Sequence, residues 1–233
     1  MTERGRRHVA RTRDRFSVGP SSVAWVDDSL VVEVNEVSVP FPRRLVGRIV
    51  LRPRARHAER WTLDGAGRHH WQPIAPNADI EVQFERPDLE WRGSGYLDSN
   101  AGSEPLEAGF RRWHWSRTPV EDGAVLTYDA ERRDGTRLAL GLHYDESGEV
   151  RRHAVPDLGA VPTTGWRIDR AVRSEGPARV QHTAEDTPFY ARSMVHGRLD
   201  GRDVRMMHES LDLDRFASRW VQTLLPFRMP RRA

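Results

Sequence analysis

The 233-residue sequence contains neither cysteine nor lysine, and each absence excludes a class of functional site. Without cysteine, the chain forms no disulfide framework and no thiolate metal centre. Without lysine, it lacks the phosphate-binding loop that ends in Gly-Lys-Ser or Gly-Lys-Thr. The Gly-x-Ser-x-Gly turn that presents a nucleophilic serine is missing as well, so the sequence indicates no candidate for a nucleophilic serine.

Long apolar runs are also absent. No run approaches the roughly 18 residues that a membrane-spanning helix needs, and the N-terminus lacks the apolar core of a secretory signal. We therefore expect a cytoplasmic protein that is soluble or attached peripherally to the inner or photosynthetic membrane.

The charge pattern argues against nucleic acid as a partner. All 37 basic residues are arginine and 34 residues are acidic, which gives a net charge of +3 and a pI near 9.9. The acidic residues are interleaved with the arginines almost one for one, whereas a nucleic-acid-binding surface needs a basic stripe with few compensating acids. Only the arginine-rich segments near the two termini come close to such a stripe, which indicates either attraction to an anionic membrane surface or a solvated, frayed end.

Short apolar runs broken by Pro, Gly and Asp dominate the chain from Trp25 onward. In residues 78–84, for example, Ile80, Val82 and Phe84 alternate onto one face of a strand. The pattern predicts an all-β, antiparallel architecture of barrel or sandwich type. A helical period is visible only in residues 213–225, which predicts a short C-terminal helix.

The β pattern pauses at residues 118–123, TPVEDG, and then restarts. This pause predicts a boundary between an N-terminal β domain, residues 1–118, which carries the candidate acid described next, and a C-terminal β domain, residues 119–233.

The densest mixture of aromatic, acidic and turn-forming residues lies at residues 91–117, WRGSGYLDSNAGSEPLEAGFRRWHWSR. The stretch predicts a strand, a tight loop and a second strand. Asp98 follows Tyr96 by two residues, which suggests a proton donor beside an aromatic-lined apolar pocket; a loop residue bonded to its own backbone is the alternative. Trp113 and Trp115 share one face of the second strand, either as pocket walls or as ordinary core residues.

The histidines do not form a metal-binding pattern. His69 and His70 are adjacent, so on a strand their side chains point to opposite faces, which is unsuitable for chelation. The other histidines are single and scattered. We expect no metal site, and a zinc site assembled from distant strands stays the alternative.

Four separated motifs carry a resemblance to a known family. They are GRHHWQPIAP at 67–76, the stretch 91–117, EDTPFYARSMV at 185–195 and HESLDLDRFASRWVQTLLPFRMPRR at 208–232. With these motifs the chain resembles the carotenoid 1,2-hydratases, also called hydroxyneurosporene synthases, over essentially its whole length. The resemblance implies two lipocalin-like, calycin-type β-barrel or sandwich domains. It also implies an additional N-terminal segment in relatives, so we expect the first domain to be incomplete, with an unpaired strand edge.

The same resemblance implies an activity. It is that of a hydro-lyase that adds water, without a cofactor, across the terminal C1=C2 double bond of an acyclic carotenoid of the neurosporene or lycopene type, in carotenoid biosynthesis. The catalytic residues that it implies are Asp98, Tyr96, His69 and Trp71. As substrate-binding candidates we add Trp91, Trp113, Trp115 and Tyr190.

The chemistry of alkene hydration fits these residue types. Protonation of C2 creates a tertiary cation at C1, which a water molecule captures. The donor must be un-ionised near neutral pH, and burial of Asp98 among apolar groups would raise its pKa accordingly. The rings of Trp71 and Tyr96 would stabilise the cation by about 0.5–2 kcal/mol each. His69 would orient Asp98 or the attacking water.

Two other functions stay open at this point. One is a non-catalytic, lipocalin-like binder or carrier of a long apolar isoprenoid, in which the aromatic residues are pocket walls and Asp98 is a turn residue. The other keeps the fold but shapes a polyene for cyclisation.

Overall fold

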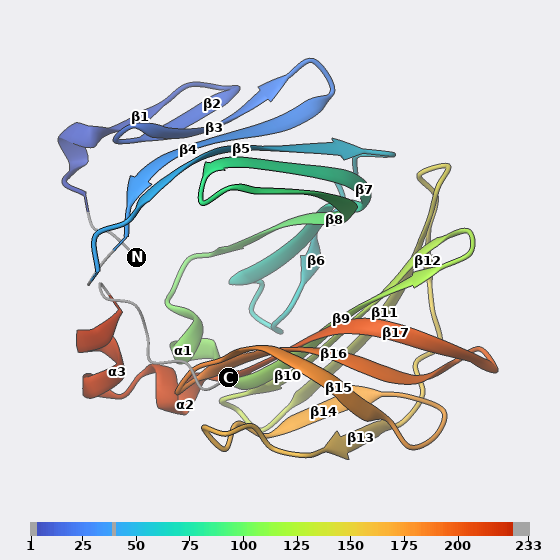
Figure 1. The fold of residues 1–233 in the computed structure, drawn as a ribbon. Helices are drawn as coiled ribbons and strands as arrows, with labels where there is room; N and C mark the ends of the chain where they lie inside the picture. The colour runs from blue at the N-terminus through green and yellow to red at the C-terminus, as the bar shows by residue number, and fades with distance from the viewer. Residues whose placement is uncertain (1–3, 39–40, 226–233) are drawn as a thin grey trace. The chain divides into compact units, whose positions relative to one another are not determined.

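The computed structural model describes residues 4–38 and 41–225, and most of its regular structure is antiparallel β-sheet (Figure 1). The predicted all-β class is therefore confirmed. An eight-stranded sheet has the order β1-β2-β3-β4-β5-β7-β6, and β8 pairs with β7 outside this path. Its strands are β1 (Val9–Arg11), β2 (Arg15–Val18), β3 (Ser21–Val26), β4 (Ser29–Val37), β5 (Arg44–Pro53), β6 (Trp61–Thr62), β7 (His69–Arg86) and β8 (Leu89–Gly102).

A seven-stranded sheet follows the order β12-β11-β10-β9-β17-β16-β15, and β13 and β14 form a separate two-stranded sheet. Within the larger sheet, β9 and β17 are distant in sequence and pair antiparallel. The strands are β9 (Phe110–Val120), β10 (Gly123–Arg132), β11 (Arg137–Asp145), β12 (Val150–Arg152), β13 (Leu158–Val161), β14 (Arg170–Arg173), β15 (Arg179–Asp186), β16 (Tyr190–Leu199) and β17 (Arg202–Asp212). The helices are η1 (Arg6–His8), α1 (Leu106–Gly109), α2 (Leu213–Phe216) and α3 (Arg219–Leu224).

The described chain divides into two compact units. Unit 1 contains the chain up to residue 56 together with residues 75–97 and 224–225, and unit 2 contains residues 57–74 and 98–223. Strands β7 and β8 contribute residues to both units. The boundary expected between residues 118 and 119 falls inside β9, and the division into domains 1–118 and 119–233 stays a prediction.

In unit 1, the central strands β4, β5 and β7 pair in antiparallel register. The apolar alternation of residues 78–84 positions Ile80 directly opposite Leu51 of β5. Leu51 is buried with Ala75 and Ala78, and Leu30 and Leu97 pack against this small core.

In unit 2, the two faces of the seven-stranded sheet differ in what they carry. On one face, Val195 and Met206 form a buried apolar cluster with Val161 of β13 and Val172 of β14. The two-stranded sheet therefore covers that face. The opposite face carries the aromatic residues, because Trp115 of β9 pairs directly with Tyr128 of β10 and directly paired residues share a face.

The C-terminal helical region of the chain is interrupted. Residues 213–225 predict one helix with a single apolar stripe, whereas the structure has two short helices, α2 and α3. Phe216 packs against Phe189, and Trp220 lies beside Trp166. Between the helices, the Ser218 hydroxyl donates to the carbonyl of Arg215 at 2.5 Å, a side-chain bond of the kind that competes with a continuous helix.

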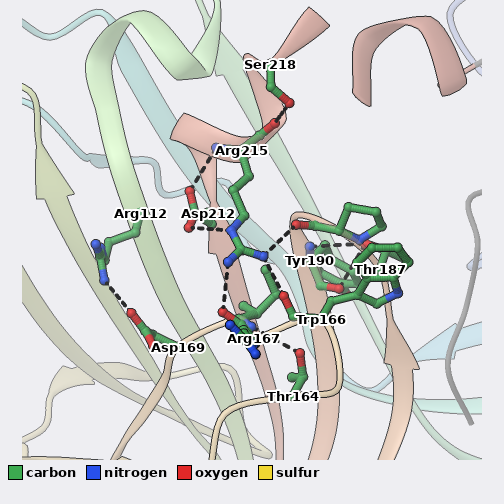
Figure 2. A network of polar contacts seen from close by, with 12 residues as sticks. Arg112, Thr164, Trp166, Arg167, Asp169, Thr187, Tyr190, Asp212, Arg215 and Ser218 are labelled. Atoms are coloured by element: carbon green, nitrogen blue, oxygen red, sulfur yellow. Dashed lines mark hydrogen bonds and ion pairs between the residues drawn. The ribbon is translucent and has the colours of Figure 1, made fainter. Parts of the chain in front are cut away.

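A polar network holds α2 to the rest of unit 2 (Figure 2). Asp212 caps α2 by accepting a hydrogen bond from the backbone N–H of Arg215 at 2.9 Å. The guanidinium of Arg215 donates to the carbonyls of Trp166 at 2.5 Å and Arg167 at 3.2 Å. Arg167 has a positive φ of 57°, and the guanidinium bond helps to hold the loop in that conformation.

None of the helices in the described residues is long and apolar enough to cross a membrane.

Candidate active site

Strands β7 and β8 bring two of the predicted catalytic residues into direct contact. The indole Nε1–H of Trp71, on β7, donates a hydrogen bond of 2.9 Å to Oδ2 of Asp98, on β8. Trp71 is fully buried and Asp98 is half-buried. Tyr96 lies two residues before Asp98 on the same strand, is half-buried and belongs to unit 1.

The direction of this hydrogen bond constrains the chemistry of Asp98. An indole N–H donates and never accepts, so Oδ2 acts as the acceptor. When Asp98 carries a proton, Oδ1 is the better place for it, because Oδ2 then acts as the carbonyl oxygen facing the indole. The contact thus makes Oδ2 the oxygen of the carboxyl group that accepts from the indole.

The ring of Tyr128 packs against the indole of Trp71. Its ring centroid is 5.0 Å from that of Trp71 and 5.9 Å from that of Trp113. The side chain is 2 % exposed, and its hydroxyl has no hydrogen-bond partner among the described residues. Burial raises the pKa of the phenol, and the nearby carboxylates of Asp98 and Glu209 raise it further. Tyr128 therefore stays protonated throughout the physiological pH range.

His69 starts β7 two residues before Trp71, on the same face of the strand. It is 1 % exposed, its Nε2 lies 3.2 Å from Oε1 of Glu104, and its ring meets Phe110 edge-on at 4.9 Å. The expected role of His69, orienting Asp98 or a water molecule, stays a prediction. Its observed ring partner is Glu104, which sequence reasoning did not find.

Asp64 holds the loop that leads into His69. Its Oδ1 accepts hydrogen bonds from the backbone N–H groups of Arg68 at 2.9 Å and His69 at 3.0 Å. Burial by itself would raise the pKa of Asp64, but these two bonds and the nearby charges outweigh burial and lower the pKa. The carboxylate is thus ionised near neutral pH and fixes where β7 begins.

The four substrate-binding candidates are distributed over both units. Trp113 and Trp115 lie on the Tyr128 face of the seven-stranded sheet, where Trp113 is half-buried and Trp115 is 7 % exposed. Tyr190 on β16 lies under the guanidinium of Arg192 at 5.7 Å, and burial raises the pKa of its hydroxyl. Trp91 belongs to unit 1, where it is 44 % exposed. Their roles in substrate binding stay predictions.

Within residues 4–38 and 41–225, no three side chains of the metal-binding types converge on a common point.

Comparison with known proteins gives one consistent result. The sequence model of a family described as carotenoid hydratase CrtC matches residues 1–233. The chain is 50% identical over 234 residues to an acyclic carotenoid 1,2-hydratase of Thiocapsa roseopersicina, and the match covers 99% of this chain and 58% of that protein. It is 46% identical over 237 residues to the acyclic carotenoid 1,2-hydratase of Rubrivivax gelatinosus, covering 100% of this chain and 58% of the relative.

The chain therefore spans somewhat more than half the length of these two relatives. A third relative, the acyclic carotenoid 1,2-hydratase of Cereibacter sphaeroides, is 41% identical over 235 residues, with 100% of this chain and 84% of that protein covered. Among solved structures, an AttH-type protein from Nitrosomonas europaea aligns with a TM-score of 0.57 and 12% identity, over 88% of this chain and 72% of that one. That likeness shows a shared fold and nothing further.

Proposed function

Because the chain belongs to the carotenoid hydratase CrtC family, we propose that it adds water to the terminal C1=C2 double bond of an acyclic carotenoid. The observation that carries the proposal is the hydrogen bond between the buried indole of Trp71 and the half-buried carboxyl group of Asp98. Among aromatic residues, this pair supplies an acid whose two oxygens have distinct environments. The substrates are a carotenoid of the neurosporene or lycopene type and water, and no cofactor takes part.

In the proposed reaction, Asp98 gives its Oδ1 proton to C2 of the alkene, and the π electrons form the new C–H bond. The tertiary cation left at C1 is captured by the oxygen of a water molecule. That water then loses a proton, which restores the acid form of Asp98 and leaves a tertiary alcohol. The indole of Trp71 keeps Oδ1 directed at the substrate, and positioning of this kind is worth about 10²-fold in rate.

The reaction itself is tested by incubating the purified chain with detergent-dispersed lycopene in ¹⁸O-labelled water. We expect a labelled mono- or dihydroxy product by mass spectrometry. Asp98→Asn should abolish that product and leave pigment binding nearly intact, because the amide has almost the same shape and cannot supply the proton. Activity of the Asp98→Asn variant equal to that of the wild type would exclude Asp98 as the donor.

The same experiment separates the hydratase from the two other functions. A folded chain that retains pigment without forming any product is the result expected of a binder of long apolar isoprenoids. A product with unchanged mass and fewer double bonds is the result expected of a cyclase.

We also propose that the protein attaches peripherally to a membrane, where such a polyene dissolves. Three exposed apolar side chains lie toward one end of the unit 1 sheet, where β4 leads to β5 and β7 leads to β8; we call Phe41, Leu89 and Trp91 the hairpin-tip cluster. Their exposed fractions are 76, 45 and 44 %. The pairing of Val46 with Arg86 supports their common location, since it brings the start of β5 beside the end of β7.

A further inference from the structure

Glu104 closes the open end of the β7–β8 strand pair. His69 is the first residue of β7 and Gly102 is the last residue of β8. Just beyond Gly102, the backbone N–H of Ser103 donates to the carbonyl of Arg68 at 3.0 Å. Glu104 then bridges two side chains, with Oε2 2.8 Å from Nη1 of Arg68 and Oε1 3.2 Å from Nε2 of His69. One carboxylate thus joins the residues that begin β7 to the segment that ends β8.

Two glycines make room for the imidazole in this arrangement. A Cβ atom at Gly102 would lie 2.8 Å from Nδ1 of His69, and a Cβ atom at Gly109 would lie 2.8 Å from Nε2. Real Cβ atoms do not approach other atoms so closely, so any side chain at either position would displace the ring. With Phe110 against its edge and 1 % of its surface exposed, His69 is enclosed by the segment 102–110.

Strand geometry places the enclosed histidine close to the Trp71–Asp98 pair. Trp71 follows His69 by two residues on the same face of β7, about 7 Å further along the strand. Asp98 precedes Gly102 by four residues on β8, again on one face. The His69–Glu104 contact at the end of the strand pair and the Trp71–Asp98 hydrogen bond within it are therefore neighbouring contacts between the same two chain segments, and a slip at the first would move the second.

We propose that Glu104 is a positioning residue for Asp98, acting through His69 and the pairing of β7 with β8. Its carboxylate accepts the Nε2–H of the imidazole, which selects the Nε2-protonated tautomer of His69. It also fixes the ring and so keeps the Trp71 indole in line with Oδ2 of Asp98. Its importance for hydration rests on the function proposed above, whereas the coupling between the two contacts does not depend on that function.

The test compares Glu104→Ala and Glu104→Gln with Glu107→Ala. Glu107 lies three residues further along the same segment, is half-buried like Glu104 and makes no side-chain hydrogen bond or ion pair among the described residues, so it is a matched control. Hydrogen exchange of the Trp71 indole N–H is followed by ¹⁵N NMR, with the signal assigned through Trp71→Phe. The half-exposed indole of Trp220 serves as an internal reference. The ¹⁵N shifts of the His69 imidazole report its tautomer.

In Glu104→Ala we expect faster exchange at Trp71, a mixture of His69 tautomers, and a kcat for hydration lower by about 10²-fold with KM little changed. Glu104→Gln should keep the Nε2–H tautomer, because its amide oxygen still accepts, and should show a smaller rise in exchange because the ion pair with Arg68 is lost. Glu107→Ala and the Trp220 signal should match the wild type.

Unchanged exchange at Trp71 in every folded Glu104 variant would overturn the proposal, and if Glu104→Ala does not fold, Glu104→Gln alone decides. A change in the NMR signals together with a wild-type chain that forms no hydrated product would retain the coupling and refute the proposed function instead. The two failures are therefore distinguishable.

Discussion

Two buried tyrosines of the seven-stranded sheet differ in what their hydroxyl groups contact. The hydroxyl of Tyr144, on β11, accepts a hydrogen bond of 3.1 Å from the indole Nε1–H of Trp61. The hydroxyl of Tyr128, on the neighbouring strand β10, has no partner among the residues that the structure describes. A buried polar group without a partner costs free energy, so Tyr128 is retained at a cost in stability, beside Trp71.

This contrast predicts opposite changes in stability for the same Tyr→Phe substitution at the two positions. Tyr128→Phe should raise the free energy of unfolding by about 1 kcal/mol, because it removes an unsatisfied hydroxyl. Tyr144→Phe should lower it by about 1 kcal/mol, because the indole N–H of the half-buried Trp61 loses its acceptor. Urea denaturation of both variants measures the difference. A loss of stability in Tyr128→Phe as large as that in Tyr144→Phe would show that the Tyr128 hydroxyl is satisfied in solution.

At the level of single residues, the resemblance named Trp71 and Asp98 as candidates but did not predict the hydrogen bond between them, and no feature of the sequence indicated Glu104. Spacings of two, such as Tyr96 to Asp98 or Trp113 to Trp115, correctly indicate which side chains share a strand face, and the resemblance supplied the chemistry. The contact between His69 and Glu104 joins positions 35 residues apart, from the start of β7 to the segment that follows β8. No local periodicity links such positions, so only the folded chain reveals them.

At the level of elements, the face of the seven-stranded sheet that lies opposite the aromatic residues carries a buried polar chain. Nδ1 of His208, on β17, is 2.8 Å from the Ser116 hydroxyl, and its Nε2 is 3.0 Å from the Ser210 hydroxyl. His114, on β9, contacts the same Ser210 hydroxyl at 3.0 Å and stacks on His208 at 5.8 Å. Burial lowers the pKa of His208 to about 3 and that of His114 to about 4, and neighbouring positive groups, including Arg170 for His208, contribute to the shifts.

The sign of the resulting pH dependence follows from these shifts. Both histidines are neutral in the folded state, whereas in the unfolded state they bind protons below their ordinary pKa of 6.5. The unfolded state therefore binds more protons as the pH falls from 6.5 toward the folded-state values, and stability is lost over that window. For His208 alone, the loss should reach about 2 kcal/mol near pH 5.

His208→Gln isolates this contribution, because glutamine keeps polar contacts with the serines and does not titrate. Between about pH 7 and pH 5, the free energy of unfolding should fall by about 2 kcal/mol less in this variant than in the wild type. His182→Gln, at an exposed position on β15, is the control and should behave as the wild type. Identical pH dependence in His208→Gln and wild type would contradict a neutral, buried His208.

The strand pairing that builds this polar chain shows which features of the strands the sequence predicts and which it does not. Alternation along β9 predicts that His114 lies on the face opposite to Trp113 and Trp115, and the register agrees, since Asp129 and not Tyr128 is paired with His114. That β9 also pairs with β17, almost a hundred residues later, follows from no local pattern. Long-range strand pairing depends on loop closure and on complementary strand faces. Which faces are complementary becomes visible only when the strands are arranged in space.

At the level of the whole molecule, the composition predicted the all-β class because turn-forming residues interrupt short apolar runs along almost the entire chain. The helical period of residues 213–225 predicted helical structure at the C-terminal end, where the structure has α2 and α3. Neither pattern predicted how the strands are arranged into three sheets. The same composition leaves the chain with a net charge of only +3, so any attraction to an anionic membrane surface should be modest and sensitive to salt.

For the molecule as a whole, we predict that it attaches to membranes through the hairpin-tip cluster. In sedimentation with anionic phospholipid vesicles, Phe41→Ser and Trp91→Ser should each weaken binding, since every aromatic side chain that leaves water contributes about 1 kcal/mol or more, close to a fivefold change in affinity. Val26→Ser is the matched control. Val26 is 49 % exposed but ends β3 beside the start of β4, at the end of the same sheet away from the β4–β5 connection. Equal weakening by Val26→Ser, or none by either aromatic substitution, would exclude the cluster as the membrane contact.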